Sequence, residues 1–308
     1  MNHSLVLLTI FTLTLLSACK SPKKNEINFA LDLPEGYEMR STVKLTSVSS
    51  IRVGIENKLS LGVTADLSHQ ARKDSTLQVV ALTLDNMNVD YSVKQQFVQN
   101  SDSDMSGGFD GKEFAKDYLG KTVDLVYDEH ARILRIEGLD EIAGPGTTDT
   151  IEAAMINTQG LFGENLVEKL VTFLAVLPTE PVSVGETWEN ILYQEVMGLP
   201  IQVDAQYKLV SRDDGFATIK IDGEMITDTA QFNMEDFEFP LGEIQGVEVA
   251  VDNIRIHLKG DHSGTVRVNE ETGWTESSIS EQDIKIEFQV GLFTLPIELK
   301  NTIEVNPR

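Results

Sequence analysis

The sequence contains one cysteine among 308 residues and has far fewer basic than acidic side chains. A single cysteine cannot form an internal disulfide, and it excludes zinc, iron–sulfur and redox sites that need several cysteines. With 25 Lys and Arg against 49 Asp and Glu, the formal net charge is −24. Because phosphate backbones are bound by basic surfaces, this charge argues against nucleic acid as a partner.

The common catalytic motifs are also absent. The sequence has no Gly-x-Ser-x-Gly, Ser-x-x-Lys or His-Glu-x-x-His motif, and these are the patterns that supply an activated serine or a zinc-bound water. We therefore expect a protein that is not an enzyme and that needs no cofactor. A hydrolase of envelope glycans stays open as an alternative, because the many carboxylates could include a pair about 5 to 9 Å apart, which a sequence does not reveal.

The N-terminus contains an apolar run from Leu5 to Leu16, which is too short to span a bilayer and has the length of a secretory signal. It ends in Leu16-Ser17-Ala18-Cys19. These residues resemble the bacterial lipoprotein signal, although Met1 to Ser4 lacks the usual basic residues. The resemblance implies cleavage after Ala18, diacylglycerol on Cys19 and a further acyl chain, such as palmitate, on the new amine.

We therefore predict a signal peptide at 1–18 and a lipidated tether at 19–32, with the membrane as a partner through Cys19. Several acyl chains, at about 0.8 kcal/mol per buried methylene, anchor a protein durably. Lys20 follows Cys19, and a residue other than Asp at this position resembles sorting to the outer membrane. The predicted location is the periplasmic face of that membrane.

The rest of the chain is dominated by residues that alternate between apolar and polar. Ile51, Val53 and Ile55 recur at every second position, as do Leu59, Leu61 and Val63, and this period is typical of half-buried β-strands. Short turn sequences separate such runs at 128–131, 212–215 and 269–273. Tight turns between consecutive strands predict an antiparallel meander.

The middle of the chain differs, because 160–177 has a wide apolar helical pattern that ends at Pro178 and Pro181. The predicted fold class is mainly β (α+β). It comprises a large curved antiparallel sheet or incomplete barrel in two β-rich halves, with a buried central helix. The predicted domain is 33–308, with halves at about 33–140 and 178–308 and a helical centre at 141–177. The stretches 101–121 and 227–248 are expected to be long loops with short helices.

Three segments resemble a family of uncharacterised lipoproteins from Bacteroidota, catalogued as domain-of-unknown-function family 6263. They are Tyr91 to Asp104, Leu119 to Leu139 and Phe173 to Trp188. The last segment is the most specific match to the family, with an apolar stretch followed by Leu-Pro and then Pro-Val-x-Val-Gly-Glu-Thr-Trp. The resemblance implies no known activity.

One local pattern suggests a metal ion. Residues Asp102 to Glu113 match the spacing of an EF-hand calcium loop, with Gly107 at position 6 and Glu113 at position 12. However, Val89 to Phe97 alternates like a strand where an EF-hand has its incoming helix. We therefore expect a solvated loop without metal, and a calcium-binding module at 102–113 is kept as an alternative.

The histidines and tryptophans give weaker signals. His257 and His262 lie five residues apart on a predicted strand, so their side chains should point to opposite faces and cannot share a zinc ion. His69 and His130 are expected at the surface in turns. Trp188 and Trp274 are expected in the core or in hairpins, rather than stacked on a sugar.

The predicted function is therefore that of a lipid-anchored cell-envelope lipoprotein of non-enzymatic type. We expect it to bind a hydrophobic ligand or an envelope protein on its curved sheet.

Overall fold

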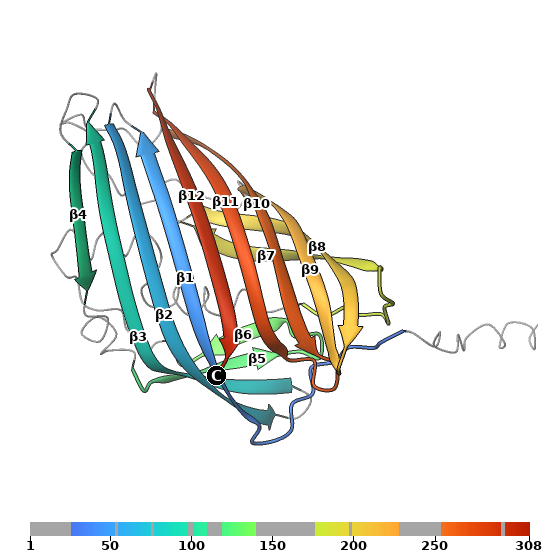
Figure 1. The fold of residues 1–308 in the computed structure, drawn as a ribbon. Helices are drawn as coiled ribbons and strands as arrows, with labels where there is room; N and C mark the ends of the chain where they lie inside the picture. Colours follow the sequence, from blue (N-terminus) through green and yellow to red (C-terminus); the bar gives the residue numbers. More distant parts are fainter. Residues whose placement is uncertain are drawn as a thin grey trace, which may run out of the picture.

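The computed structural model describes residues 26–52, 55–74, 77–97, 102–109, 119–139, 176–196, 199–227, 254–290 and 293–308. Most of these residues lie in β-strands (Figure 1). The strands are β1 (Glu38–Arg52), β2 (Ile55–Asp74), β3 (Leu77–Phe97), β4 (Asp102–Phe109), β5 (Thr122–Tyr127), β6 (Ile133–Glu137), β7 (Thr187–Val196), β8 (Leu199–Asp213), β9 (Phe216–Thr227), β10 (Ile254–Asn269), β11 (Thr275–Val290) and β12 (Phe293–Pro307).

All of these strands belong to one antiparallel sheet with the order β6-β5-β3-β2-β1-β12-β11-β10-β9-β8-β7, and β4 also pairs with β3. The first and last strands lie side by side in the middle, where Ser41 pairs with Pro307 and Ile51 with Ile297. The chain therefore runs outward from the centre to the β6 edge and resumes at the β7 edge. From there it returns to the centre.

The prediction of an α+β fold with a buried central helix is wrong. The described residues contain no α-helix, and they form a single open sheet. Of the proposed helix at 160–177, residues 160–175 lie outside the described part, and Val176 and Leu177 are buried in a non-helical segment. An apolar run does not by itself distinguish a helix from another buried segment, whereas the alternating strands carry enough one-sided apolar surface to form the core.

The predicted turns are confirmed, each with a local cause. The Asp128 carboxylate accepts hydrogen bonds from the main-chain N–H groups of His130 and Arg132, both with a donor–acceptor distance of 2.9 Å. Asp214 and Gly215 take positive φ angles of 51° and 80°, which suits the tight turns that join antiparallel strands. These turns, together with the β10–β11 turn and the C-terminus, lie at one end of the sheet, which we call the base (Figure 1).

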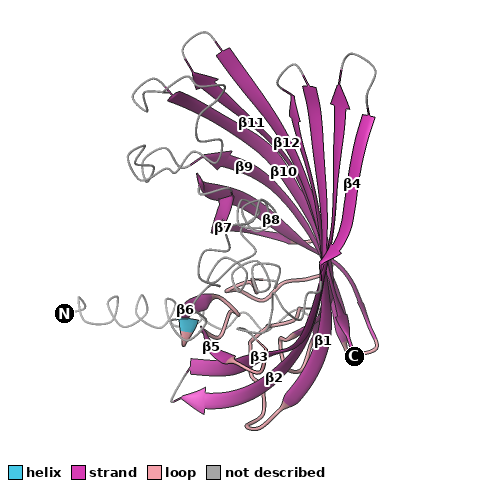
Figure 2. Ribbon diagram, turned by 90° about the vertical axis from the view of Figure 1, so that its left-hand side faces the viewer, coloured by secondary structure: helices cyan, strands magenta, loops and turns pink. Residues whose placement is uncertain are grey.

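The sheet curls strongly toward the base. Register shifts occur at four strand pairs, between Asp66 and Leu67, between Val126 and Tyr127, between Leu209 and Ser211, and between Arg267 and Val268. Each such irregularity bends a strand and increases its twist. Figure 2 shows the result, in which both flanks of the sheet turn toward the same, concave side.

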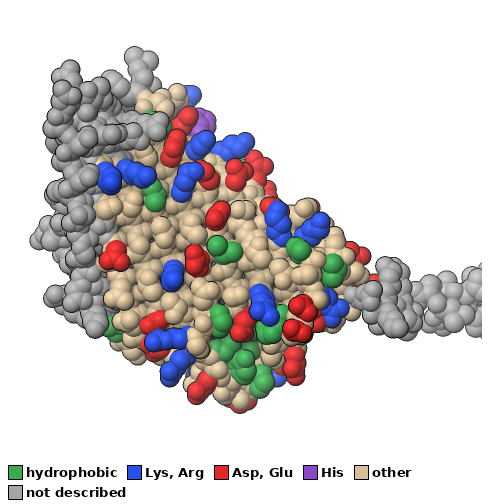
Figure 3. All heavy atoms as spheres, in the orientation of Figure 1, with side chains coloured by type: hydrophobic (Ala, Val, Ile, Leu, Met, Phe, Trp, Pro, Cys, Tyr) green, Lys and Arg blue, Asp and Glu red, His purple; other side chains and the backbone are tan. Residues whose placement is uncertain are grey.

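The two faces of the sheet differ as the alternation predicts. Odd-numbered residues such as Val43, Leu45, Leu61 and Val63 are buried on the concave face. The convex face carries side chains of both charges scattered among polar residues (Figure 3). The apolar core therefore lies on the concave side, as expected for a sheet with one solvated face.

Residues 27–36, which we call the strap, tie the two flanks together at the base. Ile27 exchanges two main-chain hydrogen bonds with Val182, each of 2.9 Å. The Leu31 N–H donates to Glu129 in the β5–β6 turn (2.8 Å), and the Asp32 N–H donates to Thr272 in the β10–β11 turn (2.9 Å). The strap therefore contacts both halves of the chain.

The strap packs because its residues alternate. Ile27, Phe29, Leu31 and Leu33 are all buried, and Phe29 and Leu33 are only 1% and 0% exposed. The predicted tether at 19–32 thus overlaps the folded protein from Ile27 onward. The alternation was present in the sequence, but the basic, Pro-interrupted residues just before it favoured a tether.

Candidate functional site at the base of the sheet

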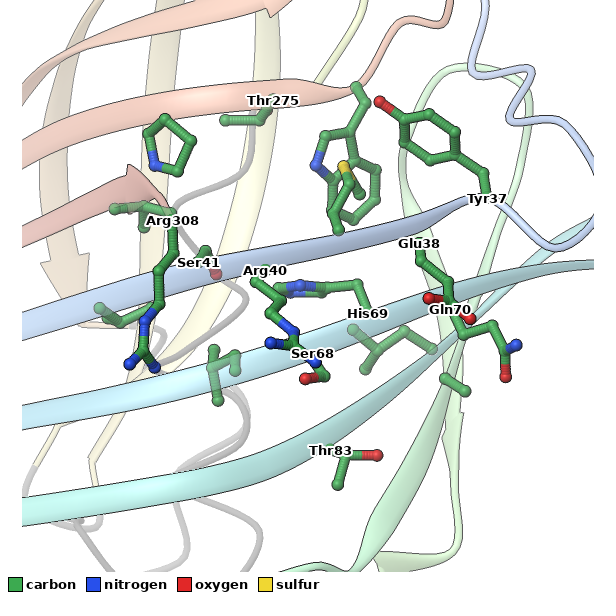
Figure 4. A pocket seen from close by; sticks show the side chains of 18 of the residues that line it. Tyr37, Glu38, Arg40, Ser41, Ser68, His69, Gln70, Thr83, Thr275 and Arg308 are labelled. Atoms are coloured by element: carbon green, nitrogen blue, oxygen red, sulfur yellow. The ribbon is translucent and has the colours of Figure 1, made fainter.

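A groove of about 690 Å³ lies at the base, where β1 and β2 meet the start of β11 and the C-terminus (Figure 4). This volume falls within the range of about 300 to 1,000 Å³ that is usual for small-molecule sites. Apolar and polar residues both line it. The polar residues that line it include Glu38, Arg40, Ser41, Ser68, His69, Gln70, Thr83, Tyr127, Glu276 and Arg308.

The inner wall of the groove is built around Trp274. The rings of His69 and Tyr127 both meet Trp274 edge-on, with centroid distances of 5.6 and 6.2 Å and interplanar angles of 67° and 82°. Such T-shaped pairs are favourable arrangements of aromatic rings. The three rings come from β2, β5 and the β10–β11 turn, so the groove forms only when distant segments meet.

Three polar atoms of this wall have no hydrogen-bond partner in the described part of the chain: the Ser41 Oγ, the His69 Nδ1 and the Tyr127 hydroxyl. All three are closed to solvent. A buried polar atom without a partner costs about 1 to 3 kcal/mol. These unpartnered atoms therefore destabilise the protein without ligand. If the wall opened, a ligand group that formed hydrogen bonds with them would remove this destabilisation.

These groups are neutral at physiological pH. Burial lowers the pKa of His69 to about 4, although a main-chain hydrogen bond with Met39 and the charge of Asp85 oppose the shift. Burial also raises the pKa of the Tyr127 phenol well above its ordinary value. The inner wall thus offers uncharged hydrogen-bonding groups.

Charged groups of both signs also line the groove, and they balance. Glu38 and Glu276 line it together with Arg40 and Arg308, and the Arg308 guanidinium pairs with Asp66 at 2.9 Å. A hydrogen bond from Thr42, opposed by burial, lowers the pKa of Asp66. The groove therefore suits a polar ligand group without strong net charge.

Tyr127→Phe tests whether the unpartnered hydroxyl carries a cost. We expect this variant to raise the free energy of unfolding by about 1 kcal/mol, because it removes a buried group that makes no hydrogen bond. Urea unfolding measures the change. Tyr207→Phe is a matched control away from the groove, because the Tyr207 hydroxyl is also buried and has no partner in the described residues. A clear loss of stability in Tyr127→Phe alone would show that this hydroxyl is bonded in solution.

The histidines fall partly as predicted. His257 is exposed and His262 is buried on the same strand, so their side chains do point to opposite faces. The described residues contain no cluster of three or more potential metal ligands. His130 lies in the β5–β6 turn, as predicted, but its side chain is only 18% exposed, whereas His69 lies within β2 and lines the groove. The surface prediction for His69 is therefore wrong, because the strand continues beyond the alternating residues that were visible in the sequence.

The two tryptophans have different surroundings. Trp188 stacks on Tyr207 at 5.6 Å, and its Nε1–H donates to the Val176 carbonyl at 2.9 Å, so it is a packing residue as predicted. Trp274 is 7% exposed and also belongs to the core, but it lines the groove as well.

The EF-hand-like segment does not have an EF-hand backbone where it is described. Asp102–Phe109 forms β4, which pairs with β3 from Gln96 to Val89, and the loop predicted for 101–121 is therefore wrong over these residues. An EF-hand loop instead wraps around its ion. Residues 110–113, which include the predicted closing ligand Glu113, lie outside the described part.

The concave face does not offer an open apolar channel among the described residues. A polar row crosses it, in which His262 pairs with Gln282, Gln282 with Asn301, and Asn301 with Ser47. Gln282 also donates to Gln194 of β7 at 3.2 Å and accepts from Asn301 at 3.1 Å. This row interrupts the apolar surface, so the groove at the base is the better candidate site.

The groove gives the hydrolase alternative no support. Its two glutamates, Glu38 and Glu276, are exposed and partly exposed. A general acid in a glycosidase needs a desolvated carboxyl whose pKa is raised.

Within the described part of the chain, no helix has the length and hydropathy to cross a membrane. The predicted lipidation site, Cys19, lies outside that part.

The described residues define the class of fold: one open antiparallel β-sheet with a mixed polar and apolar groove at one end. The chain belongs to a family of unknown function (DUF6263), whose model matches residues 74–275. The family resemblance drawn from the sequence is thereby confirmed, whereas the Bacteroidota origin and the lipoprotein character stay predictions. No curated protein matches the chain.

Two solved structures are similar in part. One describes lipid–protein interactions in lipovitellin, with 13% identity and a TM-score of 0.47, over 90% of this chain and 25% of lipovitellin. The chain thus spans about a quarter of that protein. The other is OccK7 (OpdD) of Pseudomonas aeruginosa, with 9% identity and a TM-score of 0.27, over 89% of this chain and 99% of OccK7.

Proposed function

We propose that the protein is a lipid-anchored protein of the cell envelope, held through Cys19 at the periplasmic face of the outer membrane, and that it binds a small amphipathic ligand in the groove without catalysis. The observation that carries the proposal is the inner wall of the groove, where three buried polar atoms without partners in the described residues line the groove together with Trp274. Lipid attachment rests on the residues Leu16 to Cys19.

The ligand is expected to combine an apolar part with an uncharged polar group. Val43, Leu67, Leu125 and Val305 line the groove beside the polar residues. A hydroxyl or carbonyl that entered the inner wall would give the Ser41 and Tyr127 hydroxyls a partner, and it would recover part of the cost of about 1 to 3 kcal/mol per atom.

Metabolic labelling tests the anchor. The full chain, produced in a Gram-negative host, should incorporate palmitate and sediment with membranes, whereas Cys19→Ala should do neither. Globomycin should cause the unprocessed precursor to accumulate. Equal labelling of the wild type and Cys19→Ala would contradict lipidation at this residue.

Native mass spectrometry of protein extracted gently from membranes tests ligand binding. The wild type should carry a small-molecule adduct that Tyr127→Phe loses and that the control Tyr207→Phe keeps. A wild-type spectrum without any adduct would contradict the binding part of the proposal. An adduct that both variants keep would place the ligand elsewhere.

A further inference from the structure

The strap fixes where the lipid tether meets the folded protein. Ile27 is held by its two hydrogen bonds to Val182, and it lies beside Asp214 of the β8–β9 turn and Glu271 of the β10–β11 turn, because all three line one small surface pocket. The tether therefore enters at the base, next to these two turns.

The length of the tether limits how far the base can lie from the lipid. Cys19 and Ile27 are eight residues apart in the sequence, and a fully extended chain spans about 3.3 to 3.6 Å per residue, so the tether reaches at most about 29 Å. By comparison, β3 has 21 residues and is roughly 69 Å long at about 3.3 Å per residue. The fully extended tether is thus less than half as long as β3 measured along the strand.

We propose that the base of the sheet faces the bilayer that holds Cys19, so that the groove lies at the membrane-proximal end and receives its ligand from the lipid surface. The inference rests on the proposed lipidation. Tyr37, which directly follows the strap, already lines the groove, and in Figure 4 its ribbon continues into the strand that carries Glu38 and Arg40. Lipid anchor, strap and groove are therefore consecutive along the chain.

The charge of the base keeps it from lying flat on the membrane. Several of its basic side chains are paired: Lys73 with Asp32, Arg132 with Asp128 and Arg212 with Glu270. Acidic side chains outnumber basic ones in the strap and the neighbouring turns, and those outside these three pairs are Glu35, Glu129, Asp213, Asp214 and Glu271. Anionic head groups repel such a surface within a Debye length of about 8 Å. The base therefore faces the lipid across a thin layer of water.

Energy transfer to labelled lipid tests this orientation. Because lipid occupies Cys19, an introduced cysteine is the single free thiol, and a donor dye can be placed at the base with Glu271→Cys or at the far end with Lys58→Cys. Both positions are exposed. Lys58 lies 13 residues from Ala71, where β2 meets the strap, or about 43 Å along the strand. In vesicles of phosphatidylcholine and phosphatidylglycerol with an acceptor-labelled lipid, the transfer efficiency at Glu271→Cys should be several-fold higher.

Two results would overturn the inference. Equal or higher transfer from Lys58→Cys would mean that the base does not face the lipid. A flexible Gly-Ser spacer of about 20 residues after Lys24 should reduce the difference between the two labels. An unchanged difference would contradict the inference that the short tether sets the orientation, because contact between the base and the lipid would then set it. Palmitate labelling of the same samples separates these outcomes from a failure of the proposed function, in which neither protein would be lipidated.

Discussion

Gly273→Ala is expected to reduce the free energy of unfolding by about 3 kcal/mol. Gly273 has a φ angle of +69°, and a Cβ atom there would lie 2.2 Å from the Ala30 carbonyl oxygen in the strap. A left-handed backbone costs an L-residue about 1 to 2 kcal/mol, and overpacking costs about 1 to 3 kcal/mol more. Urea unfolding measures the loss, and hydrogen exchange should show faster exchange at the Leu31 and Asp32 amides.

Gly120→Ala is the matched control. Gly120 has a nearly equal φ angle of +74°, but no described atom lies within 4 Å of the position that a Cβ would take there. This variant should therefore lose only the backbone contribution of about 1 to 2 kcal/mol. Equal losses in the two variants would mean that the contact between strap and turn adds nothing to stability.

Acidification should destabilise the protein between about pH 6.5 and pH 4. Burial lowers the pKa of both His69 and His262 to about 4, whereas an unfolded histidine titrates near 6.5. In this window the unfolded chain binds more protons than the folded one, so stability is complete above pH 6.5 and falls as the pH falls. Each histidine should contribute about 3 kcal/mol to this loss, at 1.36 kcal/mol per pKa unit.

Urea midpoints measured from pH 8 to pH 4 test the histidine effect. The double variant His69→Gln/His262→Gln should show a clearly flatter dependence on pH than the wild type. Part of the dependence on pH should persist, because the pKa values of Asp66 and Glu270 are also lowered. Protonation of these two carboxylates therefore also destabilises the folded protein as the pH falls. Identical pH profiles for wild type and double variant would contradict the buried, neutral state of the two rings.

Much of the local structure was predictable from the sequence. The period of two at Leu59, Leu61 and Val63 identified β2, and the Asp213-Asp214-Gly215 turn identified the β8–β9 hairpin. These features depend on neighbouring residues alone, since alternation sets which face is buried and turn residues set the backbone angles.

The arrangement of the strands was less predictable. The pairing of β1 with β12 joins residues more than 200 positions apart, and no local pattern encodes it. The strap was missed for a related reason, because the main-chain hydrogen bonds that hold it come from segments far away in the sequence, at Glu129, Val182 and Thr272. The central helix was predicted from a wide apolar helical pattern at 160–177 that ends at Pro178 and Pro181, and such a pattern does not determine what the segment packs against.

The groove could not be predicted as a site. Its inner wall combines Ser41, His69, Tyr127 and Trp274, which come from four separate segments. Each of them is an ordinary residue in its own segment. They meet because the sheet bends near the base, and the irregularities that bend it, such as the one between Asp66 and Leu67, follow from strand pairing rather than from local sequence.

The central position of β1 and β12 has a consequence for biosynthesis. The two halves of the sheet, β1 to β6 and β7 to β12, consist largely of pairs between strands that are close in the sequence, and these pairs can form early. The seam between them, such as Ser41 with Pro307, needs residues more than 200 positions after β1, so it closes only after β12 has been synthesised. Until then the edge of β1 presents unpaired main-chain groups, which favours aggregation. A chaperone that shields this edge in the nascent chain should therefore raise the yield of folded protein.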